Sequence, residues 1–258
     1  MSQTSLRQWR LVPRRGWRRT FVLGLLAGLA VSVLGVLSAG TAEAYVRGVD
    51  VSNWQGSVDW SRVAASGEQF AFAKATEGNF YTDPWYSANR LGARANGLRF
   101  GAYHFAKPSG STTAGIRNDA YAEADRFVNQ ARLGSGFLLP VLDLESTGGL
   151  GTWSLKYWVQ SYLARIQYRL GVKGIIYTYP SFWRTYMGNA TWFAANGYKV
   201  LWIPTGGVST PTSLPANNWN GYWWTFWQWT SCGSVPGIRG CVDRNYYHYS
   251  TFTQVLIP

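Results

Sequence analysis

Short apolar segments alternate with helix-like segments along most of the chain, and this alternation constrains the possible folds more than any other feature. Residues 48–52, 70–76, 98–106, 138–145 and 174–179 are apolar runs of strand length. Such runs, each followed by a segment with helical periodicity, predict repeated β-α units. Repeated β-α units imply a parallel sheet, which is either open or closed into a barrel.

The helix-like segments carry their own start and stop signals. In residues 83–97, Pro84 lies in the first turn and Gly97 at the end, where these residue types are typical. Three further helices are predicted, over 59–66, 114–132 and 152–171. After residue 179 the pattern changes to strand-like runs without a long helix between them, at 199–204 and 222–230. We therefore expect one α/β domain that begins with β-α units and ends in a β-rich part.

The N-terminal 44 residues have the pattern of a secretory signal. Six arginines precede an apolar stretch over residues 21–37, and the A-x-A sequence at 42–44 marks a cleavage site. We expect cleavage after Ala44 and a catalytic domain over 45–258. The stretch around Arg18 and Arg19 also resembles a twin-arginine export signal, so the export route stays open. An uncleaved membrane anchor is the alternative, because the apolar stretch is long enough to span a bilayer.

Charge and cysteine content narrow the class of protein. The net charge is +12, and the six arginines and Glu43 of the signal account for about +5, which leaves about +7. A basic exported protein suits a polyanionic surface such as a cell wall, whereas no Lys/Arg run resembles a nucleic-acid stripe. Cys232 and Cys241 are predicted to form a disulfide. With only His104 and His248 present, we expect no metal site and no cofactor.

Four acids stand at strand-like ends, far apart in the sequence. Asp50 lies near the end of the first strand, Asp143 and Glu145 near the end of the fourth, and Asp243 at the end of a late strand-like run. Carboxyl ends of parallel strands face one side, where active sites lie, so we expect these acids to converge. The alternative is a structural role in buried ion pairs with Lys74 or an arginine. The remaining acids are expected on solvated helix faces or caps: Asp59, Glu68, Asp83, Asp119, Glu123 and Asp125. Glu77 follows the second strand.

The pair Asp143 and Glu145 carries the chemistry of the hypothesis. Residues two apart on a strand share a face, with their Cβ atoms roughly 6–7 Å apart. Two like charges so close raise one pKa, and a carboxyl that stays protonated near neutral pH is a general acid. We interpret the pair as a proton donor beside a charge that stabilises a cation.

Aromatic residues indicate a sugar ligand. The chain has 15 Trp and 16 Tyr, and residues 218–230 are so dense in them that some must face outward on alternating positions. Aromatic faces beside carboxylates suit stacking on pyranose rings, and Trp227 in this run is the candidate. A packed aromatic core is the alternative for any single tryptophan.

These residues lie in motifs that together resemble the glycoside hydrolase family 25 lysozymes, the Chalaropsis-type N-acetylmuramidases. The motifs, in order, are GVDVSNWQG, FAFAKATEG, GAYHFAKP, LPVLDLE, GIIYTYPSFW, LWIP and WQWTSCGSVPGIRGCVDRN, covering about residues 47–248. The resemblance implies a modified (β/α) barrel, similar to a TIM barrel, with an antiparallel β-rich C-terminal part. It implies hydrolysis of the β-1,4 bond between N-acetylmuramic acid and N-acetylglucosamine in peptidoglycan. Pro204 in LWIP departs from the family pattern of a small residue followed by an aromatic.

Carried over position by position, the resemblance gives Glu145 as general acid and Asp143 as its companion. Asp50 and Asp243 are then further acids of the groove, and the substrate-binding candidates are Tyr103, Lys74, Tyr177 and Gln228. Either a carboxylate nucleophile or the substrate's own acetamido group attacks, and we favour the second route, in which Asp143 holds the acetamido group.

Two other classes of protein are less compatible with the sequence. A catalytically inactive wall-binding protein on the same fold would usually lack one of the four acids. An open-sheet esterase would need a G-x-S-x-G motif, which the sequence lacks. His104, inside a strand-like run, is expected to be a hydrogen-bonded barrel residue. We therefore expect a secreted, extracellular or wall-associated monomer without stable membrane insertion after signal cleavage.

Overall fold

A sheet of nine strands dominates the computed structural model, which describes residues 45–258. The strand order is β1-β9-β8-β7-β6-β5-β4-β2-β3, and β1 also pairs with β2, so the described sheet closes into a barrel with β3 attached outside. Its strands are β1 (Val46–Val51), β2 (Phe70–Glu77), β3 (Tyr81–Thr82), β4 (Arg99–Phe105), β5 (Val141–Asp143), β6 (Ile175–Tyr177), β7 (Leu201–Pro204), β8 (Phe226–Gly233) and β9 (Val242–Tyr247). The predicted signal sequence lies outside the described residues.

The direction of the strands divides the barrel into two parts. The pairs β1–β2, β2–β4, β4–β5, β5–β6, β6–β7 and β7–β8 are parallel. Strand β9 runs antiparallel to both of its neighbours, β1 and β8. The predicted α/β barrel with an antiparallel C-terminal part is therefore confirmed.

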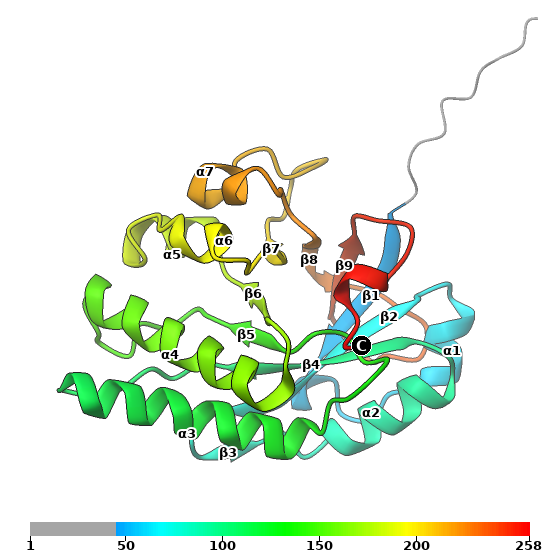
Figure 1. The fold of residues 1–258 in the computed structure, drawn as a ribbon. Coiled ribbons are helices and arrows are strands. Elements are labelled where there is room, and N and C mark those ends of the chain that lie inside the picture. The colour runs from blue at the N-terminus through cyan, green and yellow to red at the C-terminus, as the bar shows by residue number, and fades with distance from the viewer. Residues whose placement is uncertain (1–44) are drawn as a thin grey trace, which may run out of the picture. The chain divides into compact units, whose positions relative to one another are not determined.

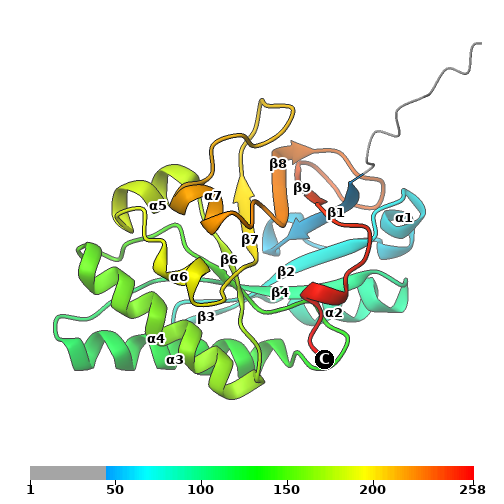
Figure 2. The ribbon, with the colours of Figure 1, turned by 45° about the horizontal axis from the view of Figure 1, so that its top comes forward.

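Helices connect the parallel strands and cover the outside of the barrel (Figures 1 and 2). They are α1 (Trp60–Ala65), α2 (Tyr86–Ala95), α3 (Thr113–Ala131), α4 (Thr152–Leu170), α5 (Pro180–Tyr186), α6 (Trp192–Ala195) and α7 (Pro215–Asn220), with 3₁₀ turns at Asn53–Gln55 and Thr253–Val255. Both views show α3 and α4 side by side, whereas the short helices α5, α6 and α7 gather near β6 and β7. The predicted long helices are confirmed. Thr112 caps α3 with its side chain, and Gly171 in a left-handed conformation ends α4.

Aromatic side chains fill the barrel below its open end. The Phe72 ring stacks on Trp202 with centroids 4.7 Å apart and meets Phe226 edge-on at 5.2 Å. Phe70 closes this cluster against Phe226 at 5.4 Å. These side chains are buried, so the barrel interior is a packed core and not a channel.

One local feature differs from the sequence-based expectation, and another agrees with it. Strand β5 has only three residues, because Pro140 just before it has no N–H to donate and the Leu139 amide bonds Val255 O outside the ladder. The Leu138 amide still bonds Phe100 O of β4. The predicted disulfide between Cys232 and Cys241 is formed and closes the β8–β9 connection. Among residues 45–258, no helix has the length and apolar character needed to cross a bilayer.

Candidate active site

A cavity of about 170 Å³ opens at the end of the barrel where the parallel strands finish. All four predicted acids line it, as do four of the predicted substrate-binding residues. The lining consists of Asp50, Ser52, Trp54, Lys74, Tyr103, Phe105, Asp143, Glu145, Tyr177, Trp202, Gln228 and Asp243. Residues that lie up to 193 positions apart in sequence, such as Asp50 and Asp243, therefore share one site.

Strand geometry explains why the acids meet. Asp143 is the last residue of β5, and Glu145, two positions later, lines the same cavity while Leu144 between them is buried. Asp243 stands directly opposite Asp50 in the β1–β9 ladder. The sequence suggested that Asp243 ends a strand, but it lies at the start of β9. Because β9 is antiparallel, its beginning reaches the same edge of the barrel as the carboxyl ends of the parallel strands.

Asp50 is fixed by a chain of hydrogen bonds. Its Oδ2 accepts from Asn245 Nδ2 at 2.7 Å and from Gln228 Nε2 at 3.1 Å. The Gln228 Oε1 in turn accepts from Tyr177 Oη at 3.0 Å, and Trp202 Nε1 donates to Asn245 Oδ1 at 2.8 Å. Both amides are thereby oriented with their NH₂ groups toward Asp50, which holds this carboxylate in one position.

The surroundings of Asp143 and Glu145 favour the protonated form of this pair. Burial raises the pKa of Asp143 well above its usual value, and the neighbouring charge of Glu145 raises it further. Burial also raises the pKa of Glu145, although contacts with Asp143 and Tyr177 oppose that rise. Lys74 lowers both pKa values by its positive charge. The environment therefore raises the pKa of both carboxyls, where the sequence predicted a rise for one of them.

The second pair of acids is also shifted. Burial raises the pKa of Asp50 to about 6, against the effect of the Asn245 and Gln228 amides. Burial, together with the charge of Asp50, raises the pKa of Asp243 to about 8. Among the described residues no lysine or arginine forms an ion pair with Asp50, Asp143, Glu145 or Asp243. The Lys74 ammonium pairs instead with Glu77 Oε2 at 2.8 Å. The alternative of a structural ion pair between Lys74 and the strand-end acids is not what the structure shows.

The structure places Trp227 outside this cavity. Its ring is buried between Trp224 and Tyr246, and its Nε1 donates to Thr205 O at 2.8 Å. On β8 the alternation turns Gln228 into the barrel, so that Trp227 faces the opposite side. Trp227 is a packing residue in this geometry, and the aromatic run 218–230 supplies the cavity with Gln228 alone.

The aromatic side chains at the cavity come from other elements, and sequence reasoning missed several of them. Trp54, Phe105 and Trp202 line it, with Trp54 85% exposed at the rim. Ser52 and Phe105 lie two positions after Asp50 and Tyr103, so strand periodicity was the signal for both. Trp54 follows in a 3₁₀ turn, where no periodicity applies.

Three of the acids expected on solvated helix faces or at helix caps are buried. Glu68 pairs with Arg244 at 3.0 Å, and Asp83 accepts hydrogen bonds from the Asn53 and Trp85 amides. Glu123 is 1% exposed, because it faces His104 across the helix–sheet interface. His104 itself is a fully hydrogen-bonded barrel residue, as predicted. Within residues 45–258, no three His, Cys, Asp or Glu side chains are arranged as a metal site requires.

A closed α/β barrel whose open end gathers four carboxylates and several aromatic rings has the architecture of a glycoside hydrolase. The sequence profile of Glycosyl hydrolases family 25 matches residues 49–238, and the chain belongs to this family. The resemblance noted from the sequence motifs is thus confirmed, and the protein is a glycoside hydrolase.

Individual relatives agree in sequence and in structure. Lysozyme M1 of Streptomyces globisporus is 39% identical over 217 residues, which cover 80% of this chain and 68% of the relative. An N,O-diacetylmuramidase of Chalaropsis sp is 34% identical over 77% of this chain and 96% of its own. A bacterial lysozyme from Streptomyces coelicolor superposes with a TM-score of 0.71 at 36% identity, covering 81% of this chain and 94% of the other. A family GH25 lysozyme from Aspergillus fumigatus gives 0.68 at 28% identity, over 81% and 96%.

Proposed function

We propose that this chain cleaves peptidoglycan glycan strands at the β-1,4 bond between N-acetylmuramic acid and N-acetylglucosamine. The observation that carries the proposal is the convergence of Asp50, Asp143, Glu145 and Asp243 on one cavity with raised carboxyl pKa values. The names of its relatives, lysozyme and muramidase, support the same substrate.

In the proposed reaction Glu145 is the general acid. It lies at the rim of the buried group and is more exposed than Asp143, so it is the carboxyl that a glycosidic oxygen reaches. Because its pKa is raised, the protonated form persists toward neutral pH and can donate to the leaving oxygen. Loss of that proton leaves a carboxylate that can later activate water.

Asp143 is proposed to orient the acetamido group of the substrate, whose oxygen attacks the anomeric carbon. The Oδ1 atom of Asp143 is buried at the cavity and has no hydrogen-bond partner within residues 45–258. A buried acceptor without a partner is costly, and an amide N–H of the ligand satisfies it. Asp50 and Asp243 then stabilise positive charge on the sugar ring, while Tyr103, Tyr177, Lys74 and Gln228 contact the substrate.

Analysis of the reducing ends tests this assignment. Purified cell walls are digested, reduced with borohydride, and the new reducing ends are identified by mass spectrometry. We expect muramic acid at the new ends. New ends that carry glucosamine would instead identify a glucosaminidase and reject the proposed bond.

We further propose that the protein is exported and acts as a monomer on the wall. The disulfide, the basic charge and the signal-like N-terminus support export. Mass spectrometry of the exported chain should find its first residue at Tyr45. A chain that keeps residues 1–44 would contradict signal cleavage.

A further inference from the structure

Strand β2 contains an irregularity beside the active site. In the ladder with β4, Lys74 pairs with Tyr103 but Thr76 pairs with His104, so Ala75 is one residue too many. Such a bulge reverses the side-chain alternation that follows it. Its effect is visible in the ion pair between Lys74 Nζ and Glu77 Oε2, 2.8 Å apart. Residues three apart on a regular strand point to opposite faces, so this contact requires the bulge.

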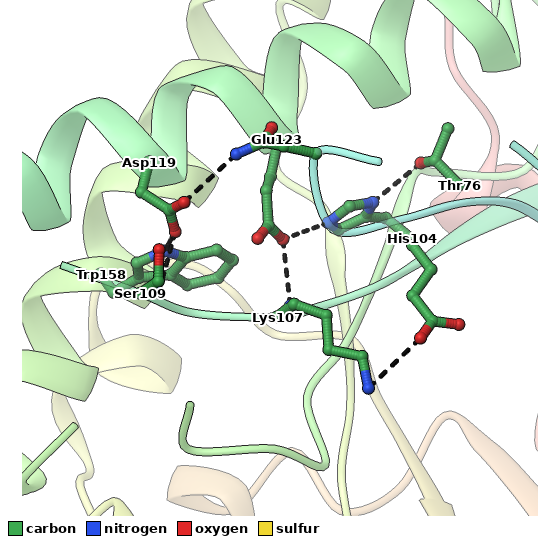
Figure 3. A network of polar contacts seen from close by, with 9 residues as sticks. Thr76, His104, Lys107, Ser109, Asp119, Glu123 and Trp158 are labelled. Atoms are coloured by element: carbon green, nitrogen blue, oxygen red, sulfur yellow. Dashed lines mark hydrogen bonds and ion pairs between the residues drawn. The ribbon is translucent and has the colours of Figure 1, made fainter. Parts of the chain in front are cut away.

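A buried polar network holds the bulged segment from the helix side (Figure 3). Thr76 Oγ1 lies 2.8 Å from His104 Nδ1, and His104 Nε2 lies 2.7 Å from Glu123 Oε2. All three side chains are essentially inaccessible to solvent. Glu123 belongs to α3, so the network ties the bulge to a helix outside the barrel. These directional bonds fix the Thr76 side chain on the helix side of the strand.

Glu123 also helps to position Lys107, which lies near the Lys74 ammonium. Glu123 Oε2 accepts a hydrogen bond from the backbone amide of Lys107 at 3.1 Å. The Lys107 Nζ then reaches Glu77 Oε1 at 3.2 Å, so Glu77 bridges Lys74 and Lys107. Both ammonium groups lie over the Phe105 ring, at 4.8 and 4.5 Å from its centroid. The Lys74 ammonium is therefore restrained by an anion and an aromatic face that Glu123 helps to place.

The position of this ammonium matters for the chemistry. Lys74 lines the cavity with Asp143 and Glu145, and its charge favours the ionised form of both. Asp50, Asp243, Tyr103 and Tyr177 face the same pair from other strands. None of these four side chains makes a hydrogen bond to Thr76, His104 or Glu123 among the described residues.

We propose that Thr76, His104 and Glu123 are positioning residues that fix the β2 bulge and thereby hold the Lys74 ammonium beside Asp143 and Glu145. The inference rests on the proposed function, because hydrolysis is its readout. It assigns a role in the reaction to a buried network that does not touch the substrate.

The first test compares Thr76→Val with Thr76→Ser. Valine keeps the size of threonine and changes no charge, but it removes the hydroxyl that bonds His104. We expect kcat on cell walls to fall by about tenfold with KM little changed, because a displaced charge alters the chemical step more than binding. Both limbs of the pH–kcat/KM profile should move to higher pH by about half a unit or more, since a more distant cation no longer lowers the carboxyl pKa values. Thr76→Ser restores the hydroxyl and should restore both measurements.

A matched control separates positioning from general destabilisation. Asp125 lies on the same helix as Glu123 but pairs with Arg165 and Arg169 of α4, away from the bulge. Asp125→Asn should lower the melting temperature without moving the pH profile, whereas Glu123→Gln should move it as Thr76→Val does. In a Lys74→Met background, Thr76→Val should add no further pH shift.

Three results would overturn the proposal. One is a folded Thr76→Val enzyme with the wild-type kcat and pH profile. Another is an equal pH shift in Asp125→Asn, and a third is an undiminished extra shift in the Lys74→Met background. Wild-type protein that fails to cleave cell walls at all would instead reject the proposed function, so the two failures are distinguishable.

Discussion

Each of the four cavity carboxylates has different partners, and these partners decide its protonation. Asp50 accepts two amide hydrogen bonds, which favour its ionised form, and its pKa rises only to about 6. Asp243 faces Asp50 across the ladder, and the pKa of Asp243 rises to about 8. Neighbouring acids are thus driven apart in pKa by unequal hydrogen bonding, which is how acid and base roles are separated in one site.

Substitution of Asp143 by asparagine tests the role of its carboxyl. We expect Asp143→Asn to lower kcat by roughly 10²–10⁴ with a small change in KM, because the group acts in the transition state. Steady-state kinetics on purified walls, with the melting temperature as folding control, measures this. A loss below about tenfold would argue against assistance by the acetamido group and toward a carboxylate nucleophile.

The raised pKa of Asp243 makes a prediction about stability and pH. The folded protein binds this proton more tightly than the unfolded chain does, so the carboxyl's contribution to stability is fully present only below about pH 4, the pKa of the unfolded chain. It is lost as pH rises toward about 8. Asp243→Asn removes the cost of ionisation, and we expect a melting temperature equal to wild type near pH 4 but a few degrees higher near pH 8.

Thermal melts of both proteins across this pH range provide the measurement. Asp50→Ala is the comparison, because it removes the oxygen that accepts from the NH₂ groups of Gln228 and Asn245 and should lose stability instead. A constant difference between Asp243→Asn and wild type at all pH values would contradict the assignment.

At the scale of elements, the sequence predicted what depends on local periodicity. The β-α units and the convergence of Asp50, Asp143 and Glu145 followed from apolar alternation and from the common direction of parallel strands. The place of Asp243 was right but its reason was wrong, because antiparallel pairing of β9 is a property of the closed barrel.

Features that depend on long-range contacts escaped prediction. Glu123 lies in a helix whose periodicity cannot show that a histidine from β4 will face it. Trp227 belongs to an aromatic run in which only the barrel decides which alternate residue faces inward. The β2 bulge at Ala75 leaves no trace in a segment where almost every residue is apolar or small.

The loop between β5 and α4 carries Glu145, and its close packing gives a prediction at this scale. Gly148 has a positive φ of 57°, and a Cβ there would lie 1.5 Å from Pro108 O in the β4–α3 loop. Gly148→Ala must therefore move one of the two loops. We expect a loss of stability of roughly 2–4 kcal/mol and a fall in kcat.

Gly149→Ala is the matched control for this loop. Gly149 also has a positive φ, 80°, but nothing lies within 4 Å of its Cβ position. It should cost only about 1 kcal/mol of backbone strain and leave kcat near wild type. Chemical denaturation and wall hydrolysis are the measurements, and equal effects of the two variants would show that loop contact is unimportant.

At the scale of the molecule, closure of the barrel creates the site. Pairing of β1 with both β2 and β9 joins the two ends of the described domain, and Asp50 is hydrogen-bonded to Asn245, 195 positions away in sequence. Residues 45–258 keep a net charge of about +7, which suits the polyanionic wall that is the proposed substrate. The fold thus brings residues from both ends of the described domain into one site.

The most direct measurement is the clearing of cell-wall suspensions by Glu145→Gln beside the wild type, with wall binding measured by co-sedimentation. Glutamine fills the same space but has no proton to donate. We predict that clearing falls by at least about 10³-fold while binding to walls is retained. Clearing at close to the wild-type rate by a folded Glu145→Gln protein would contradict the account of this cavity as the site of proton donation.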